Sequence, residues 1–387
     1  MGHGGFLTRF QFTKEVINMA NIFDYIKWRG DLSLEQSEFN EIDNLILSRF
    51  SYFPFDKIIE ENEIVTIKEL SERFKQINKN DMQILWEDDI NLFPLMGQSK
   101  RFGEMLATKY INKIDTEQEK QFSAITILMP DNTIYVAYRG TDNTIVGWKE
   151  DFNMSFKSHV ASQIDSVKYL EEIAQIYSNK LRIGGHSKGG NLAVYASTFA
   201  NKKIKDRIIN VYNNDGPGFG DDIVNTSEYK QMIEKVHTFI PQSSVIGRLL
   251  NHEEKYTVVQ STQIGIMQHD LYSWQLEGKN FICLDEVTDG SEFINKTIKG
   301  WLVNVEPKKR EQIIDVLYEI LNTTDAQTIE SLKANWFVNA KIILKTYKNI
   351  DEETKEVISQ TLYALFTIAK DNIFERIPKL PERSKKQ

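Results

Sequence analysis

Apolar residues recur at helical spacing in the first third of the chain. One set keeps steps of three or four residues: Ile42, Leu45, Ile46 and Phe50. This spacing predicts a helix that ends before Pro54. Similar spacing indicates helices over residues 67–77 and from about residue 102 to residue 111. We therefore expect an N-terminal helical cap that packs on a core formed later in the chain.

Strand patterns alternate with helix patterns between residues 122 and 260. Two apolar, β-rich runs, 122–129 and 134–138, are joined by a turn that begins at Pro130, which predicts a hairpin. An amphipathic helix is predicted over 160–176, because its apolar residues keep steps of three or four. Further segments follow: strands at 182–183, 208–212, 236–240 and 256–259, and a helix of small residues at 191–199. This alternation predicts an α/β fold with a mostly parallel sheet flanked by helices.

The ends of the chain differ from this central part. Residues 291–378 have an almost wholly helical pattern and are expected to form a C-terminal helical extension, followed by a polar tail at 379–387. Residues 1–18 fit the fold poorly and are interpreted as a possible tag or upstream start. The remaining residues, 19–290, are predicted to form the main α/β domain, including the N-terminal helical region.

Composition and charge narrow the class of protein. The net charge of −8 over 387 residues argues against nucleic acid as a partner. Cys283 is the single cysteine, so no disulfide can form within the chain, which fits a reducing compartment. No stretch approaches the roughly 20 apolar residues of a membrane span, and no signal peptide pattern precedes the fold. We expect a cytoplasmic protein without stable membrane insertion.

The most informative motif is Gly185-His186-Ser187-Lys188-Gly189, which lies between a strand pattern and a helix of small residues. A serine on a sharp strand-to-helix turn needs small neighbours, because the backbone there is strained. The start of the helix directs free N–H groups towards the serine, where an oxyanion would develop. We interpret Ser187 as a nucleophile and the backbone N–H of Lys188 as the first oxyanion donor. The alternative is a glycine-rich turn in which the serine has no role.

A second motif lies about 45 residues upstream, at the end of an earlier predicted strand. The run Val136-Ala-Tyr-Arg-Gly-Thr-Asp142, followed by Trp148 and Asp151, resembles the oxyanion segment of class 3 (fungal-type) lipases, and Gly-His-Ser-Lys-Gly resembles their nucleophile turn. The resemblance implies an α/β-hydrolase fold. It also implies that Thr141 supplies the second oxyanion N–H, with its hydroxyl either holding the loop or bonding the oxyanion. Arg139 is interpreted as structural.

A wider resemblance covers most of residues 19–280. It is carried by four segments: Ile22-Phe-Asp-Tyr25, Trp28-Arg-Gly-Asp31, Asn214-Asp-Gly-Pro-Gly-Phe219 and Gln268-His-Asp270 with Trp274. These segments are similar to an uncharacterised lipase-like family of Gram-positive bacteria, which is labelled a domain of unknown function. The resemblance implies the fold and the reaction class, but no substrate.

A serine nucleophile needs a base and an acid that orients the base. His269 is chosen as the base, because it follows the last predicted strand and matches the histidine position of the lipases. His237 within a strand, His252 on a polar loop and His186 beside the serine are not favoured. No carboxylate follows the strand at 236–240, where class 3 lipases place their aspartate, so Asp215 after the preceding strand is chosen as the acid.

The sequence leaves alternatives for the acid and for the apolar residues after the oxyanion segment. Asp215 could be a turn residue, with a Ser-His dyad oriented by the hydroxyl of Ser243 or Ser244. Trp148 and Phe152 could line an acyl pocket or simply belong to the core.

The sequence thus predicts a serine hydrolase that cleaves carboxylic esters through an acyl-enzyme on Ser187, with a small-molecule or lipid ester as substrate. No metal-ligand spacing or dinucleotide motif is present, so no cofactor and no metal are implied. Two alternatives are kept: an acyltransferase or thioesterase with the same site, and a catalytically silent binding protein on a hydrolase fold.

Overall fold

The computed structural model describes residues 20–60, 62–78, 84–142 and 144–322, and the single positions 342, 352, 355, 356 and 359. The expectations for residues 1–18, for most of the helical extension beyond residue 322 and for the polar tail 379–387 fall outside the described residues.

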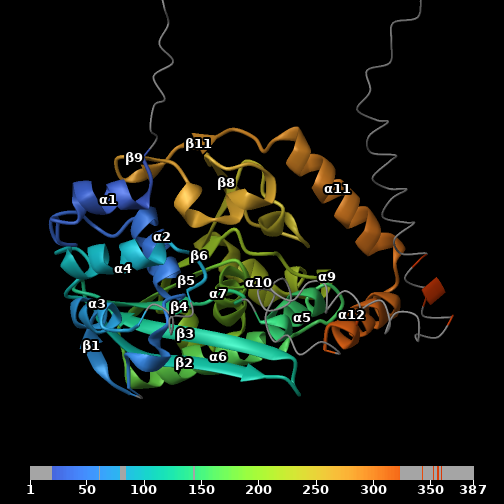
Figure 1. The fold of residues 1–387 in the computed structure, drawn as a ribbon, viewed down its shortest axis with the longest axis horizontal. Helices are drawn as coiled ribbons and strands as arrows, with labels where there is room; N and C mark the ends of the chain where they lie inside the picture. The colour runs from blue at the N-terminus through green and yellow to red at the C-terminus, as the bar shows by residue number, and fades with distance from the viewer. Residues whose placement is uncertain are drawn as a thin grey trace, which may run out of the picture.

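The described helices and strands follow one another along the chain as expected for an α/β protein (Figure 1). The helices are α1 (Ile22–Arg29), α2 (Glu41–Phe50), α3 (Ile67–Lys75), α4 (Asp89–Gln98), α5 (Ile145–Asn153), α6 (Ala161–Ile176), α7 (Lys188–Phe199), α8 (Lys202–Lys205), α9 (Asp221–Val224), α10 (Ser227–Met232), α11 (Asp289–Asn304) and α12 (Pro307–Asn322). Short 3-10 turns are η1 (Phe55–Lys57), η3 (Ile233–Lys235), η4 (Ile246–Arg248), η5 (Gly265–His269) and η6 (Leu271–Ser273). The strands are β1 (Ile64–Thr66), β2 (Leu106–Asp115), β3 (Lys120–Leu128), β4 (Thr133–Tyr138), β5 (Lys180–His186), β6 (Ile208–Asn214), β7 (Val236–Pro241), β8 (Tyr256–Val259), β9 (Leu276–Glu277), β10 (Asn280–Phe281) and β11 (Cys283–Leu284).

One mixed sheet organises the described residues. Its strand order is β1-β2-β3-β4-β5-β6-β7-β8-β11, and β9 and β10 form a separate small hairpin. The five strands from β4 to β8 pair in parallel, whereas β1 to β4 and the β8–β11 pair are antiparallel. The predicted hairpin is confirmed as β3 and β4, and the predicted α/β architecture, a central sheet flanked by helices, is present.

Helices cover both faces of the sheet, and strand β4 shows why. Ile134, Val136 and Tyr138 point to the face covered by α6 and α7, while Tyr135 and Ala137 point to the opposite face. All five side chains are almost fully buried. A strand that is apolar on both faces needs cover on both, because alternate side chains point in opposite directions.

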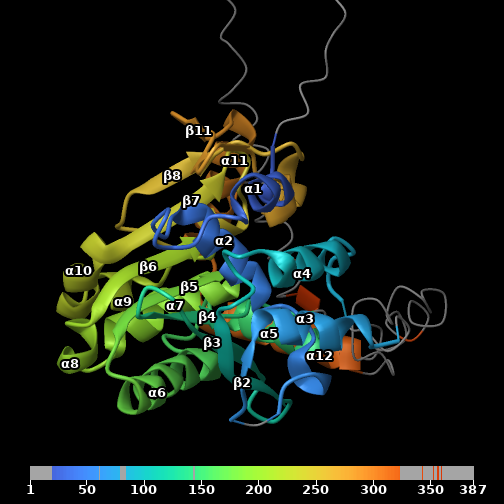
Figure 2. The same ribbon diagram turned by 90° about the vertical axis from the view of Figure 1, so that its left-hand side faces the viewer.

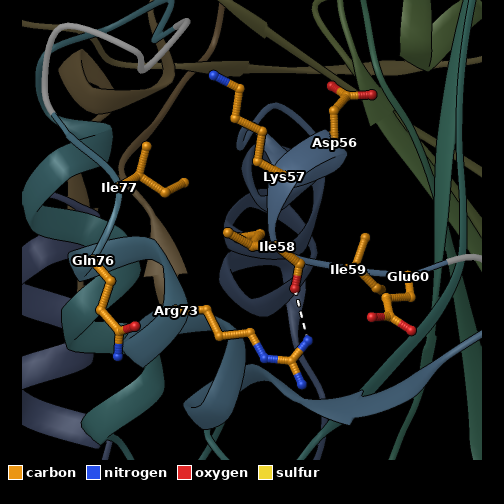
Figure 3. A pocket seen from close by; sticks show the side chains of 8 residues that line it. All are labelled: Asp56, Lys57, Ile58, Ile59, Glu60, Arg73, Gln76 and Ile77. Carbon is orange, nitrogen blue, oxygen red and sulfur yellow. Dashed lines mark hydrogen bonds between the residues drawn. The ribbon is translucent and has the colours of Figure 1, made fainter.

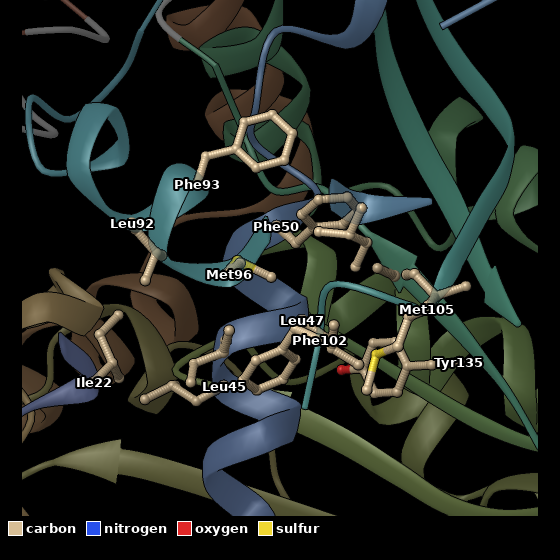
Figure 4. Packing of buried hydrophobic residues seen from close by; sticks show 14 of the residues in the cluster. Ile22, Leu45, Leu47, Phe50, Leu92, Phe93, Met96, Phe102, Met105 and Tyr135 are labelled. Atoms are coloured by element: carbon tan, nitrogen blue, oxygen red, sulfur yellow. The ribbon is translucent and has the colours of Figure 1, made fainter. Parts of the chain in front are cut away.

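The N-terminal helices provide the cover on the second face (Figures 2 and 4). Helix α2 packs on β4 and β5, α1 contacts α2, and α4 packs between α1 and α3. Figure 4 shows Leu45, Leu47 and Phe50 of α2 packed with Tyr135 and with Phe93 of α4. The predicted N-terminal helical region is therefore confirmed, and it contributes many residues to one of the two hydrophobic clusters of the described residues.

One predicted helix is wrong. Residues 106–115 form strand β2, which pairs antiparallel with β3, instead of a helix from about residue 102 to residue 111. The register shifts between Thr108 and Ile111, and Lys109 has a φ of 53°. This bulge breaks the alternation of apolar and polar residues that would have indicated a strand. Helix α4 was not expected, because Pro94 lies inside it and interrupts its pattern.

The described part of the C-terminal extension consists of α11 and α12. Helix α12 packs against α5, where Lys149 forms an ion pair of 3.0 Å with Asp315. Helix α11 begins beside the loop after β7, where the Ser291 hydroxyl donates to the Ser244 carbonyl oxygen at 2.6 Å. Among the described residues, no helix is both long enough and apolar enough to span a membrane.

Candidate active site

The candidate catalytic residues lie at the carboxyl edge of the parallel strands. Ser187 directly follows β5 and Asp215 directly follows β6, and the last residues of these neighbouring strands, His186 and Asn214, are paired. Thr141 lies beyond the end of β4. Open α/β sheets bind ligands at this edge, because the loops after the parallel strands converge there.

Ser187 occupies a strained backbone conformation at the start of α7. Its φ of 59° and ψ of −134° are unusual for a residue with a side chain, and such a conformation costs on the order of 1–3 kcal/mol. Its N–H donates to the Asn214 carbonyl oxygen at 3.0 Å. A side chain at Gly185 or Gly189 would collide with the backbone around Tyr138. The motif thus forms the tight turn that its glycines predict.

Lys188 is the first residue of α7, so its backbone N–H has no acceptor within the helix. Its side chain turns away into the core, where Nζ lies 2.9 Å from Glu150 Oε2 and 2.8 Å from Gln121 Oε1. Glu150 and Gln121 were not identified from the sequence, since no motif connects them with the serine. The ion pair neutralises the lysine charge and fixes the first turn of α7 against α5 and β3.

Asp215 and His269 are hydrogen-bonded, with 2.6 Å between Asp215 Oδ2 and His269 Nδ1. The carboxylate is 1% exposed. Its other oxygen, Oδ1, accepts the Ser244 hydroxyl at 2.5 Å and the Gly247 N–H at 3.1 Å. Asp215 also has a positive φ of 53°, which aspartate tolerates better than most residues. Three donors therefore fix the orientation of this carboxylate.

The hydroxyls of the alternative dyad contact other groups. The Ser244 hydroxyl donates to Asp215, and the Ser243 hydroxyl lies 2.9 Å from that of Thr288. The loop after β7, where the sequence has no carboxylate, thus supplies a serine that supports the carboxylate after β6. The sequence pattern could not reveal this exchange, because the two loops are adjacent only in the fold.

His269 lies beside the nucleophile turn. Its ring centroid is 4.3 Å from that of His186, the residue before Ser187, and His186 Nε2 lies 2.8 Å from the His269 carbonyl oxygen. His237 instead stacks on Tyr212 and lies 3.0 Å from Asn210. His252 pairs with Glu254 at 2.9 Å. Only His269 and His186 lie next to the turn among these four histidines.

The predicted oxyanion segment passes directly against the nucleophile turn. A Cβ atom at Gly140 would lie 3.0 Å from Ser187 Cβ and 2.6 Å from the His186 carbonyl oxygen, so only glycine allows this approach. The Thr141 hydroxyl donates to Asp151 Oδ2 at 2.5 Å. Of the two roles considered for this hydroxyl, it thus holds the loop. Arg139 is buried and pairs with Asp142 at 3.2 Å.

Exposed apolar side chains lie on the segments next to the site. Trp148 is 45% and Phe152 50% exposed on α5, which follows the oxyanion segment, so neither belongs to the buried core. Ile264, Ile266 and Met267, just before His269, are also exposed. Exposed apolar residues on two segments that adjoin one site are typical of a surface for an apolar ligand.

A separate hollow lies between η1 and α3 and contains none of the candidate catalytic residues (Figure 3). It has a volume of about 560 Å³ and a polar wall. Arg73, which lines this hollow, donates to the Ile58 carbonyl oxygen and pairs with Glu63 at 2.7 Å. No cluster of three or more potential metal ligands occurs among the described residues.

Comparisons with known proteins give one family and several structures. The model of the family described as Mbeg1-like matches residues 96–319. No curated protein matches the sequence. A Rhizomucor miehei lipase propeptide complex is similar, with 15% identity, a TM-score of 0.32, and coverage of 41% of this chain and 58% of that one.

Two further lipase structures are similar at the same level of identity. Lipase II from Rhizopus niveus has 15% identity and a TM-score of 0.33, and the match covers 49% of this chain and 75% of that one. M37 lipase has 15% identity and a TM-score of 0.35, and the match covers 55% and 71%.

Proposed function

The chain belongs to the Mbeg1-like family, and from this premise we propose that it is a serine hydrolase that cleaves carboxylic esters through an acyl-enzyme on Ser187. The observation that carries the proposal is the 2.6 Å hydrogen bond between His269 and Asp215, next to a serine with a φ of 59°. Nucleophile, base and acid then follow β5, β8 and β6, and the proposed roles are those of a Ser-His-Asp triad.

In the proposed mechanism, Asp215 keeps His269 in the tautomer that carries its proton on Nδ1. His269 Nε2 then accepts the proton of the Ser187 hydroxyl as Oγ attacks the carbonyl carbon of the ester. The negative charge on the carbonyl oxygen is bound by the backbone N–H groups of Lys188 and Thr141. His269 returns the proton to the leaving alcohol, and a water molecule hydrolyses the acyl-enzyme by the same steps.

A lipid or medium-chain ester is the proposed substrate. The exposed apolar side chains of Trp148 and Phe152 follow the oxyanion segment, and Ile266 and Met267 precede the base. An acyl chain bound in the site would remove part of this surface from water, which contributes about 25 cal/mol for each Å² buried.

The alternative of a catalytically silent fold rested on the absence of a carboxylate after β7 and on the long helical additions. The hydrogen bond of Asp215 to His269 supports an active site against the first of these reasons. Transfer of the acyl group to another nucleophile, and hydrolysis of thioesters, would use the same residues. Parallel assays with an ester and a thioester of the same acyl chain would distinguish these activities.

The proposal is tested by labelling with a fluorophosphonate and by hydrolysis of a p-nitrophenyl ester. We expect one equivalent of label on Ser187, and Ser187→Ala should lose label and lower turnover by roughly 10⁴-fold or more. Ser197→Ala is the matched control, because this buried serine lies on the same helix and donates only to the Ala193 carbonyl oxygen. Label at another serine, or full turnover in Ser187→Ala, would refute the assignment.

A further inference from the structure

Tyr52 lies just after α2, in the N-terminal helical region, yet its hydroxyl reaches the candidate active site. The hydroxyl oxygen is 3.1 Å from the backbone nitrogen of Gly140, which donates to it. It is also 3.1 Å from His186 Nδ1 and 3.1 Å from the His186 carbonyl oxygen. The side chain is 3% exposed, so these contacts form without competition from bulk water.

The proton positions around Tyr52 follow from its partners. His186 Nε2 faces the His269 carbonyl oxygen at 2.8 Å, and a carbonyl oxygen only accepts, so Nε2 carries a proton. Burial and the neighbouring His269 and Arg49 lower the pKa of His186 well below its usual value, which keeps its ring neutral. Nδ1 is then an acceptor. The Tyr52 hydroxyl therefore accepts from Gly140 and donates to His186.

These bonds form a chain across three segments of the proposed site. The chain runs from the Gly140 N–H of the oxyanion segment through the Tyr52 hydroxyl to His186 of the nucleophile turn. From His186 it continues to the carbonyl oxygen of His269, the proposed base. The three segments follow different strands, and Tyr52 is the member of the chain that comes from outside the parallel part of the sheet.

Tyr52 itself is firmly held. The Arg49 guanidinium lies 4.6 Å from the centre of the Tyr52 ring and 4.0 Å from that of Trp86, and the two rings pack edge to face. Arg49 Nε donates to Asp89 at 2.7 Å, and Asp89 accepts the Tyr272 hydroxyl at 2.6 Å. The tyrosine is thus fixed to α2 and α4, and Tyr272 connects the same cluster to the segment after His269.

We propose that Tyr52 is a positioning residue for the reaction: its hydroxyl sets the distance between the oxyanion segment and the nucleophile turn. The inference rests on the proposed function. Gly140 precedes Thr141, whose N–H is a proposed oxyanion donor, so the bond to the Gly140 N–H anchors the backbone directly before that donor, beside the nucleophile turn. Donors aimed at the oxyanion act only in the transition state, so their displacement lowers kcat and leaves KM almost unchanged.

The test compares Tyr52→Phe with Tyr25→Phe. The first variant keeps the ring packed on Arg49 and removes only the hydroxyl. The second removes an equally buried hydroxyl of the N-terminal region that contacts Asp43 and Asn40 and does not reach the catalytic segments. We expect Tyr52→Phe to lower kcat and the rate of fluorophosphonate labelling at least tenfold with little change in KM. Tyr25→Phe should change these values less than twofold, although both variants should lower Tm.

A double-mutant cycle with His186→Gln separates positioning from general loss of stability. If both residues act through one chain of hydrogen bonds, Tyr52→Phe should cost little further activity in the His186→Gln background. Equal kcat in Tyr52→Phe and wild type, or fully additive losses in the double variant, would overturn the role of Tyr52 and leave the proposed function intact. Absence of labelling in the wild-type protein would instead overturn the proposed function.

Discussion

Two residues with positive φ, Ser187 and Asp215, end neighbouring parallel strands. Each lies where an L-residue is disfavoured, and each is held by backbone bonds from the adjacent strand: Ser187 N–H to Asn214 and Asp215 N–H to Phe239. Strain of this kind persists only where surrounding structure imposes it, and it is common at active sites. The two turns direct both side chains to the same edge of the sheet.

The hydrogen bonds of the Asp215 carboxylate determine how an asparagine would be oriented at this position. Oδ1 accepts both the Ser244 hydroxyl and the Gly247 N–H, so an asparagine would keep its oxygen there and turn its NH₂ group towards His269. That group would donate to Nδ1 and force the ring proton onto Nε2, which faces the nucleophile. Asp215→Asn should therefore fold normally and lower kcat at neutral pH by roughly 10³- to 10⁴-fold.

Ser243→Ala is the matched control for this variant, because the Ser243 hydroxyl contacts Thr288 and not the carboxylate. It should retain turnover within about twofold of wild type. Ester hydrolysis measured with equal amounts of folded, unlabelled protein gives the comparison. Near-normal turnover in Asp215→Asn would exclude Asp215 as the acid.

At the scale of elements, α5 holds the oxyanion segment through a single carboxylate. Asp151 accepts the Thr141 hydroxyl and lies 3.9 Å from Lys188 Nζ. Burial raises the pKa of Asp151 to about 6, with Glu150 and Asp142 adding to this effect and Lys188 and the Thr141 hydroxyl opposing it. Ionised Asp151 therefore lowers the stability of the contact between α5 and the oxyanion segment.

The sign of the pH dependence follows from proton binding. Below its raised pKa the folded protein retains a proton on Asp151 that the unfolded chain releases near pH 3.8, so this group's contribution to stability falls as pH rises towards 6. Asp151→Asn keeps an acceptor for Thr141 without the charge. The Asp151→Asn protein should be more stable than wild type at pH 7 by about 1 kcal/mol. This value is smaller than the full pKa shift of Asp151 implies, because the side chain is 33% exposed and water screens its charge.

Urea unfolding at pH 7 and at pH 5 measures this difference, which should almost disappear at pH 5 as wild-type Asp151 takes up its proton. Asp142→Asn is a suitable control, since Asp142 pairs with the buried Arg139 on the same segment and loss of this ion pair should give no gain at pH 7. A constant difference between Asp151→Asn and wild type at both pH values would contradict the raised pKa.

At the scale of the whole molecule, the N-terminal helices belong to the core and are not an addition to it. The family model begins at residue 96, after α3 and within α4. Without the preceding residues, the sheet face that carries Tyr135, Ala137 and Ile127 would be exposed to water. Each large apolar side chain buried on that face contributes about 1.5–3 kcal/mol. Tyr52 would also be lost.

A fragment of residues 96–322 should consequently fail to fold and should not be labelled by a fluorophosphonate. A chain that starts at Met19 keeps every described residue and should fold and be labelled as the full chain is. Circular dichroism, thermal unfolding and labelling of the three proteins give the comparison. A folded, labelled 96–322 fragment would show that the N-terminal helices are dispensable.

The sequence by itself determined the alternation of strands and helices and the glycine-rich turn around Ser187. These features are local: apolar periodicity reports which faces are buried, and the glycines of Gly185-His-Ser-Lys-Gly189 report a tight turn. From them the sequence predicted Ser187 as a nucleophile, and the resemblance to class 3 lipases placed Thr141 and the late histidine His269 in the same expected site. Local periodicity failed at β2, where a bulge at Lys109 disrupts the alternation, and at α4, where Pro94 interrupts the helix.

Only the tertiary structure decided which groups complete the site. The contacts of Asp215 with His269 and Ser244, of Lys188 with Glu150, and of Tyr52 with Gly140 join residues that are 29 to 88 positions apart. No pattern along the chain encodes such pairs, since they depend on the order of strands in the sheet and on which face each helix covers. Ser187 could be predicted from the sequence because the strained turn around it is encoded locally. The groups that orient the residues around Ser187 come together only when the sheet and the N-terminal helices have packed.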